Sequence, residues 1–329
     1  MISDFHFLES TTGWIFAVTQ KLGVSLIALE PLPPHPFFLK EDFIVAIEEL
    51  EAALPRGPIA FISIGPKFAN ILNERKYYNL QFGREPWIDL SDFEPRGKRG
   101  KGVRAARNQA LRAGIGVENW KLSDLKRKSE LKDQIEAVHR YWKRKSHFSL
   151  EGFLLKTDPW KLMDDRYCFL ARNQKNEIEG VLIATPIVNS KSWYLEDMWL
   201  RRAHARGIGE LLTLEAMREL REIGSEKVSL GLVPLTDLNF SSNLPELRSI
   251  RPRMFSIGLN LMSGFLKNFY NADGLTLFRK RFNVCAWSPH FISVKMRHSV
   301  PLLRSLQWFR VVIALIIAHK PKIYFKGAK

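Results

Sequence analysis

Two adjacent carboxylates in an apolar run are the first residues of this sequence that could do chemistry. Glu196 and Asp197 lie within the run 193–200, and Arg201 follows it directly. Successive side chains of a strand point to opposite faces, so one carboxylate can face a cleft while the other faces away. The inward one could act as a general base or orient an incoming amine or hydroxyl. A structural ion pair with a neighbouring arginine explains the same residues.

A glycine-containing turn follows this run. Residues 204–209 read His-Ala-Arg-Gly-Ile-Gly, which places Arg206, Gly207 and Gly209 where an amphipathic helix is expected to begin. Free N–H groups at a helix start attract phosphate or pyrophosphate. The strand, turn and helix resemble the pyrophosphate-binding motif of GCN5-related N-acetyltransferases, in which the donor's pantetheine lies against a splayed strand that would correspond to residues 193–200. A glycine-bearing turn without a ligand is the alternative.

Basic residues are concentrated in two segments of the chain. The formal net charge is +16; residues 96–145 hold 16 Lys+Arg against five Asp+Glu, and residues 297–329 hold seven Lys+Arg and no acid. Such segments are electrostatic footprints for phosphates, whether of nucleic acid or of anionic lipid. In the first segment Lys98 precedes an expected helix, on which the spacing of Arg104 and Arg107 predicts a shared face.

Length and composition indicate a globular protein of about two domains. The chain has 329 residues, of which 46% are hydrophobic and 26% charged. The first residues lack a basic, then apolar, signal pattern. The two cysteines, Cys168 and Cys285, have no metal-binding spacing, so a reducing cytoplasm and no metal site are expected.

The C-terminal segment contains an uninterrupted apolar run at 311–318, between Arg310 and Lys320. This run is far shorter than the roughly 20 residues that span a bilayer. With Arg304 and Trp308 nearby, the segment could lie in the headgroup region of a membrane. A helix packed on the second domain is the alternative.

The elements that must position these residues alternate between strands and helices, which predicts a mixed α/β (α+β) fold. Strands are predicted at 14–18, 24–29, 59–64, 87–90, 167–171, 179–184, 193–200 and 227–233. Helices are predicted at 41–54, 66–75, 103–112, 123–145 (with Ser123 as N-cap), 207–223 and 255–270.

Four motifs in order resemble the phosphatidylglycerol lysyltransferase C-terminal-domain family, the catalytic part of the multiple peptide resistance factors. They are the stretch 82–93 (Phe-Gly-Arg-Glu-Pro-Trp-Ile-Asp-Leu-Ser-Asp-Phe), the stretch 193–212, the strand 228–235 (Val-Ser-Leu-Gly-Leu-Val-Pro-Leu), and the stretch 274–282 with Trp287 behind it. The family's Asp-Leu-Met-Arg segment carries an arginine three residues after the aspartate, whereas here Leu200 holds that position and Arg201 follows.

The resemblance implies two tandem GCN5-related acetyltransferase-like domains joined by a basic helix. The expected boundaries are 1–122 for the first domain, 123–146 for the connecting helix, 147–299 for the catalytic domain and 300–329 for a basic amphipathic tail. The implied activity moves an aminoacyl group from aminoacyl-tRNA to a phospholipid such as phosphatidylglycerol, without a cofactor, at the inner face of the membrane.

The resemblance also orders the candidate residues. It implies Asp197 as the functional carboxylate, with Glu196 and Arg201 beside it. It implies phosphate or donor binding by Arg206, Gly207, Gly209, Lys98, Arg104, Arg107 and, from the basic run 279–281, Lys280. Alternating basic residues on a solvated edge strand are the alternative for that run; the resemblance favours Lys280 over this alternative, and its neighbours Arg279 and Arg281 less so.

Two other functions fit the sequence. One is an acyl-CoA-dependent N- or O-acyltransferase that uses Gly207 and Gly209 for the donor's pyrophosphate. The other is a non-catalytic module that binds tRNA or membrane. Serine hydrolase chemistry is not expected, because Ser229 and Ser288 lack a Gly-x-Ser-x-Gly elbow. The histidines at 204, 290 and 298 have no partner at triad or metal spacing and are interpreted as incidental.

Overall fold

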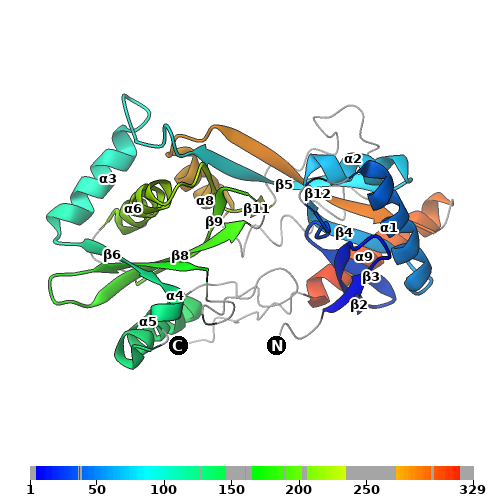
Figure 1. Ribbon diagram of the computed structural model, residues 1–329, viewed down its shortest axis with the longest axis horizontal. Helices are drawn as coiled ribbons and strands as arrows, with labels where there is room; N and C mark the ends of the chain where they lie inside the picture. Colours follow the sequence, from blue (N-terminus) through cyan, green and yellow to red (C-terminus); the bar gives the residue numbers. More distant parts are fainter. Residues whose placement is uncertain are drawn as a thin grey trace.

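A computed structural model describes most of the chain, and its elements form one continuous sheet flanked by helices (Figure 1). The described residues are 5–35, 37, 39–125, 127–145, 160, 165–187, 190–201, 206–234, 272–297 and 300–318. For six of these residues the structure describes the backbone alone: Lys145, Glu196, Asp197, Ala272, Asp273 and Pro301.

The described strands join in the order β1-β2-β3-β4-β12-β5-β10-β9-β8-β7-β6, and β11 pairs with β5 beside this path. The strands are β1 (His6–Glu9), β2 (Ile15–Lys21), β3 (Val24–Ala28), β4 (Ile59–Ile64), β5 (Tyr78–Asp89), β6 (Gly116–Lys121), β7 (Tyr167–Arg172), β8 (Ile178–Ile187), β9 (Ser192–Leu200), β10 (Lys227–Ser229), β11 (Val233–Pro234) and β12 (Ala286–Lys295).

The helices connect these strands and cover both faces of the sheet. They are α1 (Lys40–Ala53), α2 (Pro66–Glu74), α3 (Lys101–Arg112), α4 (Leu122–Leu125), α5 (Ser129–Lys145), α6 (Ile208–Glu222), α8 (Ala272–Lys280) and α9 (Pro301–Ala318). None of these described helices has the length and apolar character needed to cross a bilayer.

The two halves of the chain repeat one order of elements and exchange their last strands. In each half a helix joins two parallel strands, as β3-α1-β4 and as β9-α6-β10. The last strand of the first half is β5, which follows α2, and the last strand of the second half is β12, which follows α8. Each of them pairs with the other half, since β12 pairs with β4 and β5 pairs with β10. The antiparallel pair of β5 and β12 lies at the centre (Figure 1). The exchange therefore joins both halves into one sheet, and the predicted mixed α/β class is confirmed.

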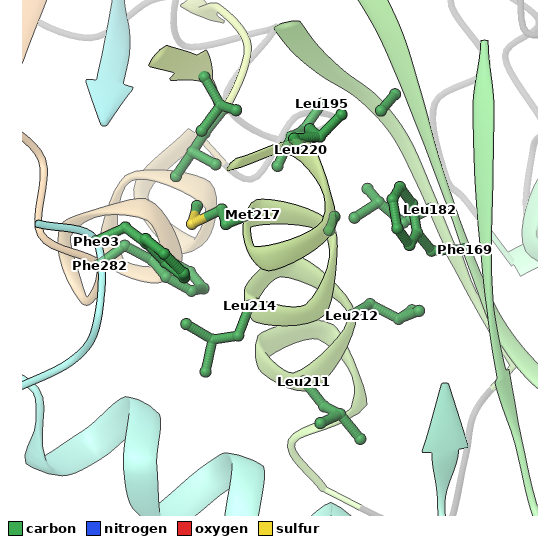
Figure 2. Close-up of a cluster of buried hydrophobic side chains, with 14 of the residues drawn as sticks. Phe93, Phe169, Leu182, Leu195, Leu211, Leu212, Leu214, Met217, Leu220 and Phe282 are labelled. Carbon is green, nitrogen blue, oxygen red and sulfur yellow. The ribbon is translucent and has the colours of Figure 1, made fainter. Parts of the chain in front are cut away.

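Helix α6 is the central packing element of the second half (Figure 2). Most of its residues are buried, which distinguishes it from a surface helix with a single apolar stripe. Leu212 lies on the side of the helix toward Phe169 and Leu182 of the sheet, while Met217 lies toward Phe93 and Phe282. The helix ends at Glu222, and Gly224 has a φ of +87°, which suits the left-handed position after a helix.

The first half has a core on each face of its sheet. On one face Phe61 of β4 packs with Phe43 of α1 and Phe68 of α2. On the other face Ile62 packs with Trp308 of α9. Strands β3 and β4 are buried along their whole length, as expected for parallel strands covered on both faces.

The position of α9 corrects the alternative that the C-terminal segment packs on the second domain, and its placement in a headgroup region stays a prediction. The helix packs on β2 and β3 of the first half, not on the second domain (Figure 1). Trp308 is 4% exposed and belongs to this core, so it is not at a headgroup interface. Residues 319–329 lie outside the described part of the chain.

Three other expectations about the elements were wrong. The predicted helix 123–145 is divided into α4 and α5, so Ser123 lies inside α4 and does not cap a long helix. The basic run 279–281 covers the last two residues of helix α8 and the residue after it, so the edge-strand alternative for this run was wrong. The predicted strand 87–90 is the end of the much longer β5, and β6 was not predicted. The predicted helix 255–270 lies outside the described residues.

Candidate functional site

Strands β9 and β10 diverge at the middle of the second half. Their parallel ladder consists of three pairs, Lys227↔Ser192, Val228↔Trp193 and Ser229↔Tyr194, whereas β9 stays paired with β8 as far as Leu200. Beyond Tyr194, the edge of β9 that faces away from β8 has no partner in β10. This divergence is the splayed arrangement that the sequence predicted for residues 193–200.

A basic and a phenolic side chain meet at the point of divergence. The Arg279 Nη1 atom donates a hydrogen bond to the Gly231 carbonyl oxygen at 2.7 Å. A β-carbon placed on Gly231 would lie 3.0 Å from the Tyr194 hydroxyl oxygen and 3.2 Å from Arg279 Nη2. Gly231 also has a φ of +85°, which favours glycine. The turn after β10 is therefore shaped so that Arg279 and Tyr194 can approach its backbone closely.

A chain of four polar side chains crosses the centre of the sheet next to this point. Ser229 donates to Glu85 Oε1 at 2.6 Å. Glu85 Oε2 lies 3.1 Å from His290 Nε2, and His290 Nδ1 lies 3.1 Å from Ser63 Oγ. An ionised carboxylate can only accept, so Nε2 carries the proton and Nδ1 of a neutral ring accepts from Ser63. The interpretation of His290 as incidental was wrong.

The pKa values of Glu85, which belongs to this polar chain, and of nearby Glu30 are shifted in opposite directions. Burial alone would raise the pKa of Glu85, but the hydrogen bonds from His290 and Ser229 outweigh it and hold the pKa below its ordinary value. Burial raises the pKa of Glu30, against the hydrogen bond that its carboxylate accepts from the Gly65 N–H at 2.8 Å. A lowered and a raised carboxyl pKa in one region are typical of functional sites.

The two serines of the polar chain occupy equivalent positions in the two halves. Ser63 lies in the sequence Ile-Ser-Ile-Gly at 62–65, and Ser229 lies in Val-Ser-Leu-Gly at 228–231. Ser63 is the last residue but one of β4, and Ser229 is the last residue of β10; these are the second strands of the two parallel pairs. Ser63 has a φ of +66°, which costs a non-glycine residue about 1–2 kcal/mol. Glu85 and His290 therefore join corresponding points of the two halves.

The predicted donor-binding loop lies against the basic helix α3. A β-carbon on Gly207 would come within 1.9 Å of the Ala106 carbonyl oxygen, and its φ is +90°. Gly209 is buried, with Met198 Sδ 3.1 Å and the Phe278 ring 3.5 Å from the place of a β-carbon. Close helix packing thus accounts for both glycines. Arg206 is exposed at the start of the helix.

The predicted phosphate ligands on α3 differ in how they are engaged. Arg104 donates to the carbonyl oxygens of Pro95 (2.8 Å) and Gly97 (2.9 Å), so it holds the loop before the helix. Arg107 is half-buried and contacts Asn108 Oδ1 at 3.2 Å. Lys98 is exposed. The contact of Gly207 with α3 is made at the backbone of Ala106, and residues two apart on a helix, such as Arg104 and Ala106, do not share a face.

Three consecutive basic residues, the last two of α8 and the one after it, lie in different environments. Arg279 contacts Gly231 at the point of divergence, as described above. Lys280, the predicted ligand, is exposed. Arg281 forms an ion pair with Glu210 of α6 at 2.8 Å. Of the three, Arg279 is the one that contacts Gly231, whose N–H donates to Ser229 Oγ of the polar chain. Nothing in the sequence spacing singled it out.

The predicted catalytic carboxylates are located by their backbone alone. Asp197 pairs with Ile183 in the ladder between β8 and β9. The N–H of Arg201 donates to the Glu179 carbonyl oxygen at 2.9 Å as the strand ends. The roles of Glu196, Asp197 and Arg201 stay predictions.

Sequence reasoning did not select Glu85, His290 or Tyr194, and it ranked Arg279 below its neighbour Lys280. The signal that the sequence offered for such a site was a polar residue inside an otherwise apolar strand motif, such as Ser229. In the described residues no group of three His, Cys, Asp or Glu is arranged to hold a metal ion.

The exchanged sheet and the divergence of β9 from β10 define a mixed α/β protein with two repeated halves that share one sheet. The family model described as phosphatidylglycerol lysyltransferase, C-terminal, matches residues 2–292. The chain belongs to this family, as its four motifs predicted.

Similar proteins of known sequence or structure agree with this assignment. A phosphatidylglycerol lysyltransferase of Bacillus subtilis is 22% identical over 308 residues, which are 91% of this chain and 33% of the relative. The structure of L-PGS from Bacillus licheniformis is 17% identical, with a TM-score of 0.72 over 96% of this chain and 90% of that one. The C-terminal domain of a putative lysylphosphatidylglycerol synthetase from Agrobacterium fabrum is 20% identical, with a TM-score of 0.74 over 99% of this chain and 92% of that one. The chain spans between 30% and 41% of the length of the curated relatives it matches.

Proposed function

We propose that this chain transfers an aminoacyl group from aminoacyl-tRNA to a hydroxyl of phosphatidylglycerol or a related anionic phospholipid. The convergence of Glu85, His290, Tyr194 and Arg279 where β9 leaves β10 carries this proposal. The family membership supports the class of reaction, and the relative from Bacillus subtilis bears the name of that activity.

The reaction needs few groups from the protein, since an aminoacyl ester is already activated. The acceptor hydroxyl oxygen attacks the ester carbonyl carbon, and the bond from that carbon to the ribose oxygen breaks. The hydroxyl proton passes to a carboxylate or imidazole and ends on the ribose oxygen. Holding the two substrates together supplies most of the rate enhancement in such a reaction.

Two sets of residues are proposed for these tasks. Asp197, or the Glu85–His290 pair, accepts the proton from the hydroxyl, and the lowered pKa of Glu85 keeps it ionised at neutral pH. Arg279 binds the acceptor phosphate, because its guanidinium lies at Gly231, where β9 leaves β10, and a guanidinium matches the geometry of a phosphate. Lys98, Arg107, Arg206 and Lys280 bind phosphates of the tRNA, with Glu196 and Arg201 beside the reacting groups.

Proposed localisation follows from the acceptor. A phospholipid acceptor lies in a membrane, and aminoacyl-tRNA is present in the cytoplasm, so the protein would act at the inner face of the membrane. The basic segment 96–145 supplies charge for the tRNA, which predicts a strong dependence of donor binding on salt.

The test is a reconstituted transfer assay with a mixture of labelled aminoacyl-tRNAs and detergent-dispersed phosphatidylglycerol. Labelled lipid should form with the wild type, and its rate of formation should fall about 100-fold when the group that accepts the proton is removed, by Asp197→Ala or by Glu85→Gln. A parallel reaction supplies labelled acetyl-CoA instead of aminoacyl-tRNA. Acylation only in that parallel reaction would replace the proposal with the acyl-CoA-dependent alternative, and no product in either would favour a non-catalytic module.

A further inference from the structure

Helix α9 is apolar on its outer face as well as on the face that packs against the sheet. On the inner face Trp308, Val311 and Ala314 are buried against β3 and β4. The helix has 18 residues and no acidic residue. A surface helix of a globular protein normally carries polar residues on its outward side, and a helix that is apolar all round is normally covered.

The outward side of α9 presents a row of large apolar side chains. At about 100° per residue, their positions fall within one stripe of the helix. Leu302 and Phe309 are exposed by 62% and 58%, more than half of each side chain. The other exposed members of this outer stripe are Leu306, Ile316 and Ile317.

A turn of the neighbouring sheet extends the outer stripe. Arg310 Nη2 donates to the Leu22 carbonyl oxygen at 2.7 Å, so the turn between β2 and β3 lies against this helix. Leu22 is 53% exposed and has a φ of +51°, a conformation in which Gly, Asn or Asp is usual. A large apolar side chain at such a position does not relieve the backbone strain of the turn, and it adds to the apolar surface.

Two basic side chains lie close to the outer stripe. Arg310 lies beside the turn, and Arg297 donates through its Nε to the Gly57 carbonyl oxygen at the same end of the sheet. The sequence has seven Lys+Arg and no acid from residue 297 to its end. An apolar helix face flanked by basic residues suits a surface whose polar layer is anionic and whose interior is hydrocarbon.

We propose that the outer stripe of α9, with Leu22, docks the protein onto an anionic lipid bilayer. The apolar side chains enter the boundary between headgroups and acyl chains, and Arg297 and Arg310 face the lipid phosphates. The helix lies parallel to the membrane and keeps its inner face on the sheet. This inference deepens the proposed function, because it identifies the surface that would keep the protein at its lipid acceptor.

The test compares two helical surfaces by vesicle co-sedimentation. The probe is vesicles of equal parts phosphatidylglycerol and phosphatidylcholine. The double variant Leu306→Gln/Phe309→Gln should bind at least about tenfold more weakly than the wild type, since two partly buried apolar side chains are lost. Val45→Gln changes an exposed apolar residue of α1, on the opposite face of the sheet, and should bind like the wild type. Arg310→Gln should weaken binding about fivefold, and pure phosphatidylcholine should bind poorly to all.

Several results would overturn the docking proposal. One is wild-type protein that stays in the supernatant with anionic vesicles, and another is a double variant that binds as well as the wild type. A third is a wild-type dimer in light scattering that the double variant converts to monomer, which would assign the stripe to a second copy of the chain. Thermal melts of the two variants establish that both are folded.

The docking proposal and the proposed function fail in different ways. The double variant should lose transfer to phosphatidylglycerol in vesicles but keep transfer to the detergent-dispersed lipid. If the wild type transfers nothing to dispersed lipid and still binds vesicles, the proposed function fails and the docking surface stands.

Discussion

The packing of α6 on α3 makes a quantitative prediction for Gly207→Ala. The new β-carbon would come within 1.9 Å of the Ala106 carbonyl oxygen, which requires the two helices to move apart. Displacing a well-packed element costs typically about 1–3 kcal/mol. The φ of +90° adds about 1–2 kcal/mol for any residue with a β-carbon. We therefore expect Gly207→Ala to lower the free energy of unfolding by about 2–5 kcal/mol.

Gly224→Ala is the matched control at the other end of the same helix. Gly224 has nearly the same φ, +87°, but no atom lies within 4 Å of the place of its β-carbon. This variant should lose only about 1–2 kcal/mol, for the backbone conformation alone. The difference between the two variants measures the helix contact by itself.

Urea denaturation followed by tryptophan fluorescence gives both free energies. Equal losses for Gly207→Ala and Gly224→Ala would refute the close contact with Ala106. Gly207 would then be free of a packing role, and its interpretation as a phosphate-binding glycine would regain its basis.

Three further predictions concern stability and accessibility. Glu30→Gln should stabilise the protein increasingly as the pH rises from about 4.5 to 7, because the raised folded-state pKa of Glu30 makes the wild type lose stability on ionisation; urea midpoints across that range check this, and a constant difference would contradict it. Glu85→Gln should have the opposite trend, since the stability that its lowered pKa contributes is present above about 4.5 and is lost as the pH falls through the folded-state pKa; unfolding at pH 3 and pH 7 tests the sign. A thiol reagent should modify exposed Cys285 in the folded protein and reach buried Cys168, whose pKa is raised by burial, only in denaturant; two fast-reacting thiols in the native state would contradict the buried position.

Periodicity and turn chemistry located most of the described elements. Pro66 at the start of α2 and Gly224 after α6 marked helix ends that the structure confirms. The turn at 173–176 between β7 and β8 was also predictable, because Asn173 accepts hydrogen bonds from the backbone of Lys175 and Glu177. These features depend on neighbouring residues, so the local sequence contains the necessary information.

The exchange of β5 and β12 could not be read from local sequence. Each strand pairs with residues more than a hundred positions away, as where Trp87 lies opposite both Ala286 and Ser229. The repeat that marks equivalent positions in the halves is only a few residues long, around Ser63 and Ser229. Spacing rules for triads and metal sites consider nearby residues, and therefore could not associate His290 with its partners.

The candidate site shows the same limit. The basic character of the run 279–281 was evident, but three neighbours with equal charge differ only in what they contact. The family resemblance directed attention to Lys280, whereas the structure places Arg279 at the divergence of β9 and β10. Helix α8 produces this difference, since consecutive helical residues point about 100° apart.

Kinetics of aminoacyl transfer to phosphatidylglycerol in Arg279→Gln and Lys280→Gln test the central claim most directly. If Arg279 binds the acceptor phosphate, Arg279→Gln should raise the KM for the lipid roughly 10- to 100-fold, the loss of one charge-assisted hydrogen bond, while Lys280→Gln changes it little. Glu85→Gln should lower kcat about 100-fold with little change in KM. Equal effects of Arg279→Gln and Lys280→Gln on the KM for the lipid, or full activity in Glu85→Gln, would contradict the placement of the reaction at this point of the sheet.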